Sequence, residues 1–351
     1  MATKKRKKQI KKAVKQLKGL STWAIAFVAG ILVCLALLLG WKAVNDPVFG
    51  EKLGGSISDL LNETKEPIEI LEEWLFGDPD VQTMAPTVAE GTMQVDIIDV
   101  GQGESILITT AEKAVLIDAG ENDMGDEVLA HLAKRGITKL DLAIGTHAHS
   151  DHIGGMDTVL AEIPTDEFWM GIMPEELVPS TKSYMDVLEQ LDIGRVPYRE
   201  PEVGTQYDLG GGGVLGGGGV LTVFGPQGIP DDLNNCSLVC RIDFGESSFL
   251  FSGDTEEEME KKILKSGMDL DVDVMTMGHH GSSTSSCTEY FKAASPEYAV
   301  ISCGTNNSYG HPHTETIKKL KNADVLYRRT DINGTVTFVT DGSNIEYSTE
   351  R

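Results

Sequence analysis

The segment LAIGTHAHSDHIGG, residues 142–155, indicates both a fold class and a chemistry. Its apolar start predicts a short buried strand. In an extended turn after that strand, His147 and His149 project to the same side, while Asp151 and His152 point to a neighbouring position where the chain begins to coil. Imidazole and carboxylate groups are the ligands that suit Zn²⁺, Mn²⁺ or Fe²⁺. The segment therefore predicts a metal site at the end of a strand.

Other segments also place polar side chains directly after an apolar run. These runs end in Asp118 (AVLIDAG), in Asp254 (SFLFSGDT) and in His279 and His280 (DVMTMGHHGS), and the loop after YAVISCG carries His311. Residues that follow strands converge on one edge of a sheet, where rigid backbone holds them. Six of the eight histidines fall in these places and in the first segment, so we expect one polar site rather than scattered core histidines.

Two divalent cations fit these ligands, with Asp254 as the bridge between them. Paired ions about 3.5–4 Å apart can share a hydroxide, lower its pKa towards neutrality and stabilise charge on a phosphoryl or carbonyl oxygen. Zinc is the expected metal, and manganese is the alternative. The residues thus favour a hydrolase that uses a metal-bound hydroxide.

From Thr92 onward, short β-branched runs alternate with amphipathic stretches, which is typical of a layered domain of strands and helices. The expected strands are Met93–Val100, Ser105–Thr109, Ala114–Ile117, Leu140–Gly145, Val220–Phe224, Ser237–Phe244, Ser247–Phe251, Val272–Met277, Tyr298–Cys303 and Thr335–Val339. The expected helices are Asp126–Arg135, Gly155–Glu162, Lys182–Leu191, Glu256–Ser266, Cys287–Ala294 and Thr314–Asn322. The glycine-rich run 210–219 is interpreted as a flexible connector, because it lacks the Lys-Ser/Thr pair of a phosphate-binding loop.

Seven segments resemble the extracytoplasmic hydrolase domain of ComEC-type DNA-uptake proteins, a branch of the metallo-β-lactamase-fold hydrolases. They are VDIIDVGQGESILI (95–108), VLIDAG (115–120), THAHSDHIGG (146–155), NNCSLVCRIDFG (234–245), FLFSGDT (249–255), GHHGSSTSS (278–286) and SYGHPHTETIKKL (308–320). The resemblance spans about Met93 to Val339 in family order. It implies an α+β fold, an αββα sandwich of two face-to-face β-sheets with helices outside, and a dinuclear site along one edge.

The resemblance also implies roles for individual residues. The metal ligands would be His147 and His149 for the first ion, Asp151 and His152 for the second, Asp254 as the bridge, and His279 or His280 to complete the second ion's shell. The choice between His279 and His280 stays open, and the other histidine would contact the substrate's phosphate. Asp151, His279 and His311 are the expected catalytic side chains, with His311 as general acid or oxyanion donor. Asp118 and Asn235 are expected to orient the ligands.

One ligand of the wider superfamily is missing from this sequence. Many members supply a further histidine between the His-x-His-x-Asp-His motif and the bridging aspartate, but none occurs here from Ile153 to Met277. Asn234–Ser237 occupies that interval. We therefore expect the first ion to be weakly held or to complete its shell with water.

Charge divides the chain into a basic stem and an acidic body. Residues 1–41 contain nine Lys and Arg and no Asp or Glu, whereas the remaining 310 residues contain 21 basic and 54 acidic side chains. Such a body repels polyanions at long range, so any contact with nucleic acid must be local or assisted by metal.

The amino-terminal part predicts a membrane anchor. After a basic cytoplasmic tail (1–21), the uncharged stretch within residues 22–41 is long enough to cross the roughly 30 Å hydrocarbon layer as one helix. A cleaved signal peptide is the alternative interpretation. An acidic spacer (42–91) then leads to the hydrolase domain (92–351), which we expect outside the cytoplasm. One span is too few for a DNA-conducting pore.

These observations favour a single-pass, extracytoplasmic, metal-dependent phosphodiesterase. Candidate substrates are DNA, RNA or a phosphoryl-decorated envelope polymer, and no protein partner can be inferred. The same metal chemistry would also serve the hydrolysis of a lactam, thioester or lactone. A non-catalytic binding module that uses metal only for folding is the third hypothesis.

Overall fold

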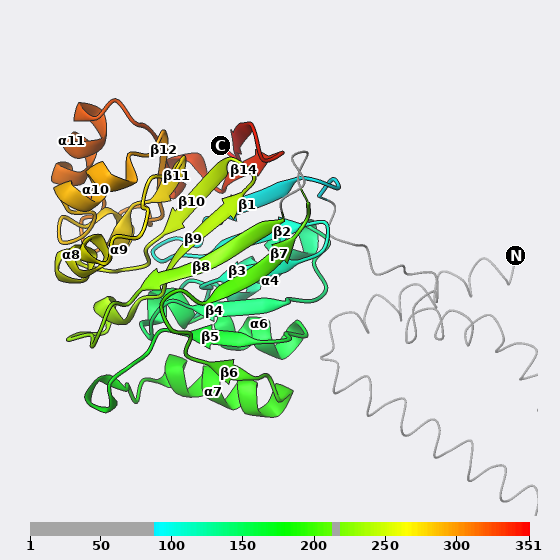
Figure 1. Ribbon diagram of the computed structural model, residues 1–351. Helices are drawn as coiled ribbons and strands as arrows, with labels where there is room; N and C mark the ends of the chain where they lie inside the picture. The colour runs from blue at the N-terminus through cyan, green and yellow to red at the C-terminus, as the bar shows by residue number, and fades with distance from the viewer. Residues whose placement is uncertain (1–87, 213–217) are drawn as a thin grey trace, which may run out of the picture. The chain divides into compact units, whose positions relative to one another are not determined.

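The computed structural model describes residues 88–212 and 218–351 (Figure 1). The expected basic tail (1–21), membrane-spanning helix (22–41) and nearly all of the spacer (42–91) lie outside the described residues. Among the helices within the described ranges, none combines the length and the apolar character needed to cross a bilayer.

Two mixed β-sheets form the centre of the described part of the chain. The eight-stranded sheet has the order β15-β14-β1-β2-β3-β4-β5-β6, and the seven-stranded sheet has the order β13-β12-β11-β10-β9-β8-β7. The first contains β1 (Met93–Ile97), β2 (Ile106–Thr110), β3 (Ala114–Ile117), β4 (Leu142–Gly145), β5 (Phe168–Met170), β6 (Tyr198–Arg199), β14 (Val336–Thr340) and β15 (Ile345–Thr349). The second contains β7 (Gln206–Gly210), β8 (Gly219–Gly225), β9 (Val239–Phe244), β10 (Ser247–Phe251), β11 (Val274–Thr276), β12 (Tyr298–Ile301) and β13 (Leu326–Arg329).

Helices cover the outer face of each sheet, and short helices occupy the loops (Figure 1). Helices α4, α6 and α7 share a buried apolar cluster with the first sheet, and α8, α10 and α11 share one with the second. The helices are α4 (Gly125–Lys134), α5 (Ser150–Ile153), α6 (Met156–Glu162), α7 (Lys182–Gly194), α8 (Glu257–Ser266), α9 (Gly278–Gly281), α10 (Thr288–Ala294), α11 (Thr314–Asn322) and α12 (Thr330–Asn333), with 3₁₀ turns η1 (Glu175–Leu177) and η2 (Asn234–Cys236). The predicted αββα sandwich is confirmed.

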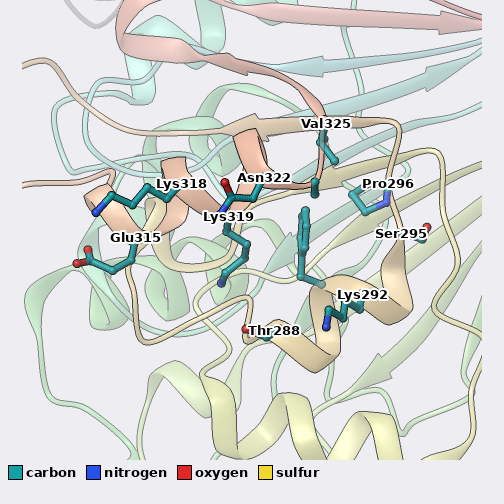
Figure 2. Close-up of a pocket in the computed structure, with 11 residues that line it drawn as sticks. Thr288, Lys292, Ser295, Pro296, Glu315, Lys318, Lys319, Asn322 and Val325 are labelled. Carbon is teal, nitrogen blue, oxygen red and sulfur yellow. The ribbon is translucent and has the colours of Figure 1, made fainter.

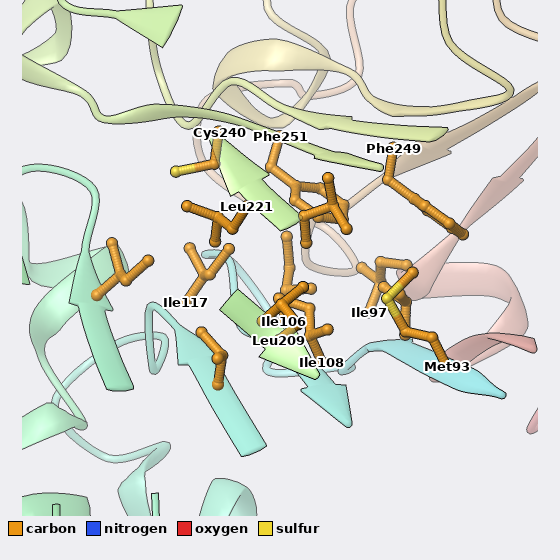
Figure 3. Packing of buried hydrophobic residues seen from close by; sticks show 14 of the residues in the cluster. Met93, Ile97, Ile106, Ile108, Ile117, Leu209, Leu221, Cys240, Phe249 and Phe251 are labelled. Atoms are coloured by element: carbon orange, nitrogen blue, oxygen red, sulfur yellow. The ribbon is translucent and has the colours of Figure 1, made fainter. Parts of the chain in front are cut away.

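The main core lies between the two sheets (Figure 3). Successive strand residues point to opposite faces, so a strand buried on both sides is apolar throughout. In β3, Val115 and Ile117 join the cluster between the sheets, whereas Leu116 joins the cluster under the helices. Across the interface, Phe249 and Phe251 of β10 fill the space opposite these branched side chains.

The strands that sequence patterns missed share one property. The unpredicted strands are β5, β6, β7, β13 and β15, and four of these five are the edge strands of the two sheets. Edge strands are short or half-exposed and need no continuous apolar run. Both residues of β6 are exposed, and β15 alternates between exposed and partly buried positions. The apolar periodicity that predicts central strands is therefore absent at the sheet margins.

Parallel pairing brings the site residues to one edge of the sandwich. Strand β3 pairs parallel with β4, and β11 pairs parallel with both β10 and β12. Parallel neighbours end on the same side of a sheet, so the loops that follow these strands gather there. The expected convergence of strand ends is thereby explained by the topology.

Candidate metal centre

Four loops deliver the polar side chains of the site. The loop after β4 carries His147 and His149 and continues into α5 with Asp151 and His152, while Asp254 follows β10. The turn α9 after β11 carries His279 and His280, and Asp118 follows β3. Each loop leaves a buried strand, so rigid backbone fixes where the side chain begins.

The first set of candidate ligands consists of Asp151, His152, His280 and Asp254, whose donor atoms all lie within 4.8 Å of one another. His152 Nε2 lies 3.1 Å from Asp254 Oδ1, and His280 Nε2 lies 3.3 Å from Asp151 Oδ2. The two Nε2 atoms are 3.2 Å apart. All four side chains are buried except Asp151, which is partly exposed. We name this set the His280 group.

The second set consists of His147, His149 and Asp254. His147 Nε2 lies 2.9 Å from His149 Nδ1 and 3.8 Å from Asp254 Oδ2. Burial holds the pKa of both histidines below the ordinary value, so each is a neutral imidazole, which is the form that binds a cation. We name this set the His147 group. It has one donor fewer than the His280 group.

Asp254 belongs to both groups and presents a different oxygen to each. Its Oδ1 faces His152 and His280, and its Oδ2 faces His147 and His279. Burial opposes ionisation of this carboxyl, but the positive charge on His152 and His280 outweighs burial and holds its pKa well below the ordinary value. Asp254 therefore lies between the two sets of donors, and its role as a bridge between two ions stays a prediction.

Contacts at the Nδ1 atoms of His152 and His280 orient the two histidines of the His280 group. His152 Nδ1 lies 2.7 Å from Asp118 Oδ2, and the Thr146 hydroxyl donates to the same oxygen at 2.7 Å. The other Asp118 oxygen accepts the Thr146 backbone N–H at 2.8 Å. His280 Nδ1 donates to the Ser302 carbonyl oxygen at 3.0 Å. These contacts leave both Nε2 atoms free to face Asp254.

The structure separates the roles of His279 and His280, which the sequence left open. Both residues adopt a left-handed backbone, with φ near 54°. His280 is buried and joins the His280 group, whereas His279 is more exposed and turns to the other side of Asp254. His279 Nε2 lies 3.5 Å from Asp254 Oδ2, and its Nδ1 lies 3.4 Å from Glu256 Oε1. Of the two, only His280 thus lies within a set of donors that could hold a metal ion, while both line the cavity.

A cavity of about 220 Å³ opens over the two groups. Its lining includes Asp151, Asp254, His279, His280 and His311, together with Gln102, His149, Ser150, Asn234 and Tyr309. Burial and the neighbouring histidines lower the pKa of His311 to about 4, so this side chain is neutral at pH 7. Its Nδ1 is buried and has no hydrogen-bond partner among the described residues. Tyr309 stacks on it and is 61% exposed.

The sequence indicated that Asn235 orients the ligands, but the side chain that contacts the two groups from this segment is Ser237. The Asn235 amide donates to Asp231 and Asp232, and its Oδ1 accepts the Glu256 N–H, so it holds the neighbouring loops together without touching a ligand group. Ser237 Oγ lies 3.2 Å from His147 Nδ1 and accepts the Asp254 N–H at 3.1 Å. Its place in the interval that lacks the expected histidine was the only signal for it.

The glycine motif GQG (101–103) supports the site through backbone contacts. A Cβ at Gly103, whose φ is +135°, would lie 2.3 Å from the Asp151 carbonyl oxygen. Glu104 donates its backbone N–H to that oxygen at 3.1 Å, and its buried carboxyl lies within 4.8 Å of Asp118 and His152. Burial raises the Glu104 pKa to about 7. Glycine is required here because the loop packs directly on the ligand turn.

The donor atoms fit divalent cations. Asp254 Oδ1 is buried and makes no hydrogen bond of good geometry within the described residues, although two imidazole nitrogens face it. A buried carboxylate oxygen without a partner is costly unless a cation completes its surroundings. Nitrogen and carboxylate donors suit zinc, manganese and iron alike. The clusters are therefore suited to binding metal ions, and the choice among these metals stays a proposal.

Comparison with known proteins agrees with this geometry. Residues 98–305 match the model of the metallo-beta-lactamase superfamily. The chain is 30% identical over 265 residues to ComE operon protein 3 of Bacillus subtilis, covering 70% of this chain and 33% of that protein. It is 29% identical over 253 residues to competence protein ComA of Neisseria gonorrhoeae, covering 72% and 33%. The metallo-beta-lactamase fold protein YhfI from Bacillus subtilis aligns with 11% identity and a TM-score of 0.46, over 73% of this chain and 100% of that one.

The matched residues include every member of the His280 and His147 groups, whereas His311 of the cavity wall lies beyond the end of the match. The resemblance to ComEC-type proteins that the motifs indicated is confirmed by these relatives. The chain spans about a third of the length of the curated relatives that it matches. Because the superfamily model matches more than half of the chain, the chain belongs to the metallo-β-lactamase superfamily.

Proposed function

We propose that this chain is a metal-dependent phosphodiesterase that cleaves a nucleic acid strand outside the cytoplasm. The observation that carries the proposal is the position of Asp254 between two sets of buried donors, each facing a different carboxylate oxygen. Two ions placed there would supply a water nucleophile that ionises near neutral pH and Lewis-acid stabilisation of phosphoryl oxygens. His147, His149, Asp151, His152, Asp254 and His280 are the proposed ligands.

The residues of the cavity wall would bind the phosphate. His279 and His311 lie with ring centroids 5.5 Å apart on the same side of the cavity. Because its pKa is lowered to about 4, His311 acts as a neutral hydrogen-bond donor to a phosphoryl oxygen rather than as a charged acid. Asp118 keeps His152 in one tautomer, so that Nε2 faces the site throughout the reaction.

The relatives support a nucleic acid as the substrate. One of them is named a competence protein, and a third relative, 29% identical over 255 residues, is recombination protein 2 of Haemophilus influenzae. We extend this association to the present chain as part of the proposal. We also propose that residues 22–41 anchor the chain in the membrane with the hydrolase domain on the extracytoplasmic side, because the basic cluster precedes the span.

The test uses the full chain in detergent, loaded with Zn²⁺ or Mn²⁺. Turnover is measured on labelled single-stranded DNA and on bis-p-nitrophenyl phosphate, with Asp151→Ala as the inactive reference. We expect metal-dependent cleavage of both substrates by the wild type. Equal rates for the wild type and Asp151→Ala on both substrates would refute phosphodiesterase chemistry, and turnover of nitrocefin or a thioester instead would favour the alternative hydrolase.

A further inference from the structure

A second concave site lies between helices α10 and α11 (Figure 2), and it shares no lining residue with the cavity of the metal centre. Its volume is about 710 Å³. Phe291, Pro296 and Val325 provide apolar walls, while Lys292 extends from α10 and Lys318 and Lys319 extend from α11. Glu315 is the one carboxylate in its lining. We name this site the α10–α11 groove.

Three of the basic side chains that lack an ion pair line this one groove. Residues 88–351 contain 18 Lys and Arg against 44 Asp and Glu. Half of the 18 basic side chains, nine in all, form ion pairs with described carboxylates. Lys292, Lys318 and Lys319 form no such pair with any described residue, even though carboxylates outnumber cations more than twofold. The charges of Lys292 and Lys318, which are both exposed, are therefore available to an anion from outside, whereas Lys319 is partly buried.

The groove adjoins the metal centre through shared backbone. Both of its helices begin soon after site residues, α10 after the GHHG turn and α11 after His311. The Ser283 N–H donates to His313 Nδ1 at 2.9 Å, and the Thr316 hydroxyl donates to the Ser282 carbonyl oxygen at 3.2 Å. The Lys319 ammonium donates to the Ser286 carbonyl oxygen. The loop 282–287 thus connects the turn that carries His280 with Thr288, the first residue of α10 that lines the groove.

We propose that the α10–α11 groove binds the sugar–phosphate backbone of the single nucleic acid strand whose scissile phosphate lies at the metal centre. This inference rests on the proposed function for the identity of the strand. The lysines supply local positive potential, which a domain with this excess of acid needs before it can hold a polyanion.

The test compares two double variants with the same change in net charge. Lys292→Glu/Lys318→Glu alters the groove, and Lys134→Glu/Lys265→Glu alters two exposed lysines on α4 and α8 that also lack ion pairs among the described residues. Binding of a fluorescein-labelled oligothymidylate to the full, metal-free chain is followed by anisotropy over a range of salt concentrations. Circular dichroism and thermal melting confirm that both variants fold.

We expect the groove variant to bind on the order of tenfold more weakly than the control variant. The slope of log Kd against log salt should become shallower by about 1.4, which corresponds to two lost phosphate contacts on a single strand. Turnover of bis-p-nitrophenyl phosphate, which is too small to reach from the metal centre along the groove, should match that of the wild type.

Equal oligothymidylate binding by the two double variants would overturn the proposal. Equal competition by polyglutamate of the same charge would overturn its assignment to a nucleic acid. A wild type that cleaves no diester, combined with loss of oligothymidylate binding by the groove variant alone, would refute the proposed function but support the groove as a binding site for the strand. Diester cleavage by the wild type, combined with unchanged oligothymidylate binding by the groove variant, would support the proposed function and refute the groove as a binding site.

Discussion

The His280 group and the His147 group share Asp254 but differ in what orients their histidines. In the His280 group, His152 is held by the carboxylate of Asp118 and His280 by the carbonyl oxygen of Ser302. In the His147 group, Nδ1 of His147 contacts only hydroxyls, those of Thr146 and Ser237. A carboxylate or carbonyl partner fixes the tautomer and raises the basicity of the ligand, whereas a hydroxyl can act as donor or acceptor.

This difference indicates unequal affinity at the two positions. The His280 group offers four donors and two firmly oriented imidazoles, whereas the His147 group offers three donors. We therefore expect the ion at the His280 group to bind more tightly and the ion at the His147 group to exchange more readily. The missing superfamily histidine affects the His147 side, which agrees with the weak first ion expected from the sequence.

The largest effect is expected from Asp254→Asn, which removes the group common to both positions. An amide cannot bridge two cations with two anionic oxygens, so the affinity of the chain for both ions should fall together. Phosphodiesterase activity should fall by roughly three orders of magnitude, which corresponds to several kcal/mol of lost transition-state stabilisation. Metal content by elemental analysis and kcat/KM on bis-p-nitrophenyl phosphate measure the two effects.

Asp243→Asn is the matched control, because this carboxylate lies on β9 and pairs with Arg241 away from the site. It should retain both ions and the activity. If Asp254→Asn kept one ion at full occupancy, the shared bridge would be wrong, and the two groups would have to be treated as independent sites.

The next two variants test the difference between the His280 group and the His147 group directly. Asp118→Asn removes the carboxylate behind His152, and should lower metal affinity at the His280 group by about 10–100-fold. Ser237→Ala removes one of two hydroxyls behind His147 and the acceptor of the Asp254 N–H but no carboxylate, and should lower affinity at the His147 group by only about threefold. Competition of each variant with a coloured zinc chelator resolves the two binding steps.

A loss in Ser237→Ala as large as that in Asp118→Asn would contradict the assigned difference between the groups. Asp243→Asn again serves as control for the removal of an aspartate charge. Thr146 contacts both histidines, at 3.1 Å to His147 and 3.3 Å to His152, so it is unsuitable as a selective variant.

The sequence predicts the centre of the fold better than its margins, for a physical reason. Central strands such as β3 and β10 are buried on both faces and so carry continuous apolar runs, and they were predicted with the bounds observed. The edge strands β6, β7, β13 and β15 carry no such run. Their positions are set by pairing with a neighbour, which a local pattern does not encode.

A similar division applies to the site. The residues proposed as ligands follow buried strands and have chemically distinctive side chains, so their convergence was predictable. Ser237, Thr146 and Ser302 were missed because serine and threonine are common in loops, and Ser302 acts through its carbonyl oxygen, which every residue possesses. The inward turn of His280 rather than His279 depends on two successive left-handed residues, which residue type alone does not determine.

The smallest effect on metal binding and activity is expected from Glu260, which supports the loop after His280. Glu260 on α8 is fully buried, and its carboxylate accepts the backbone N–H groups of Ser286 and Cys287 in the loop that follows the GHHG turn. Ser286 in turn accepts the Gly278 N–H at 3.0 Å through its hydroxyl. Burial outweighs these hydrogen bonds and raises the Glu260 pKa from 4.5 to about 7.

A raised carboxyl pKa links protonation to folding. Between pH 4.5 and 7 the folded chain keeps a proton on Glu260 that the unfolded chain releases, so the stability contributed by the protonated form is fully present below pH 4.5 and is lost as the pH rises through 7. Glu260→Gln cannot titrate. Relative to this variant, the wild type should therefore lose on the order of 3 kcal/mol of unfolding free energy over that interval. Urea unfolding of the metal-free chain at several pH values measures the difference, with the exposed Glu297→Gln as control. A wild-type curve parallel to that of Glu260→Gln would show that the carboxyl is ionised throughout, and the loop after His280 would then be held by a buried charge rather than by a neutral acid.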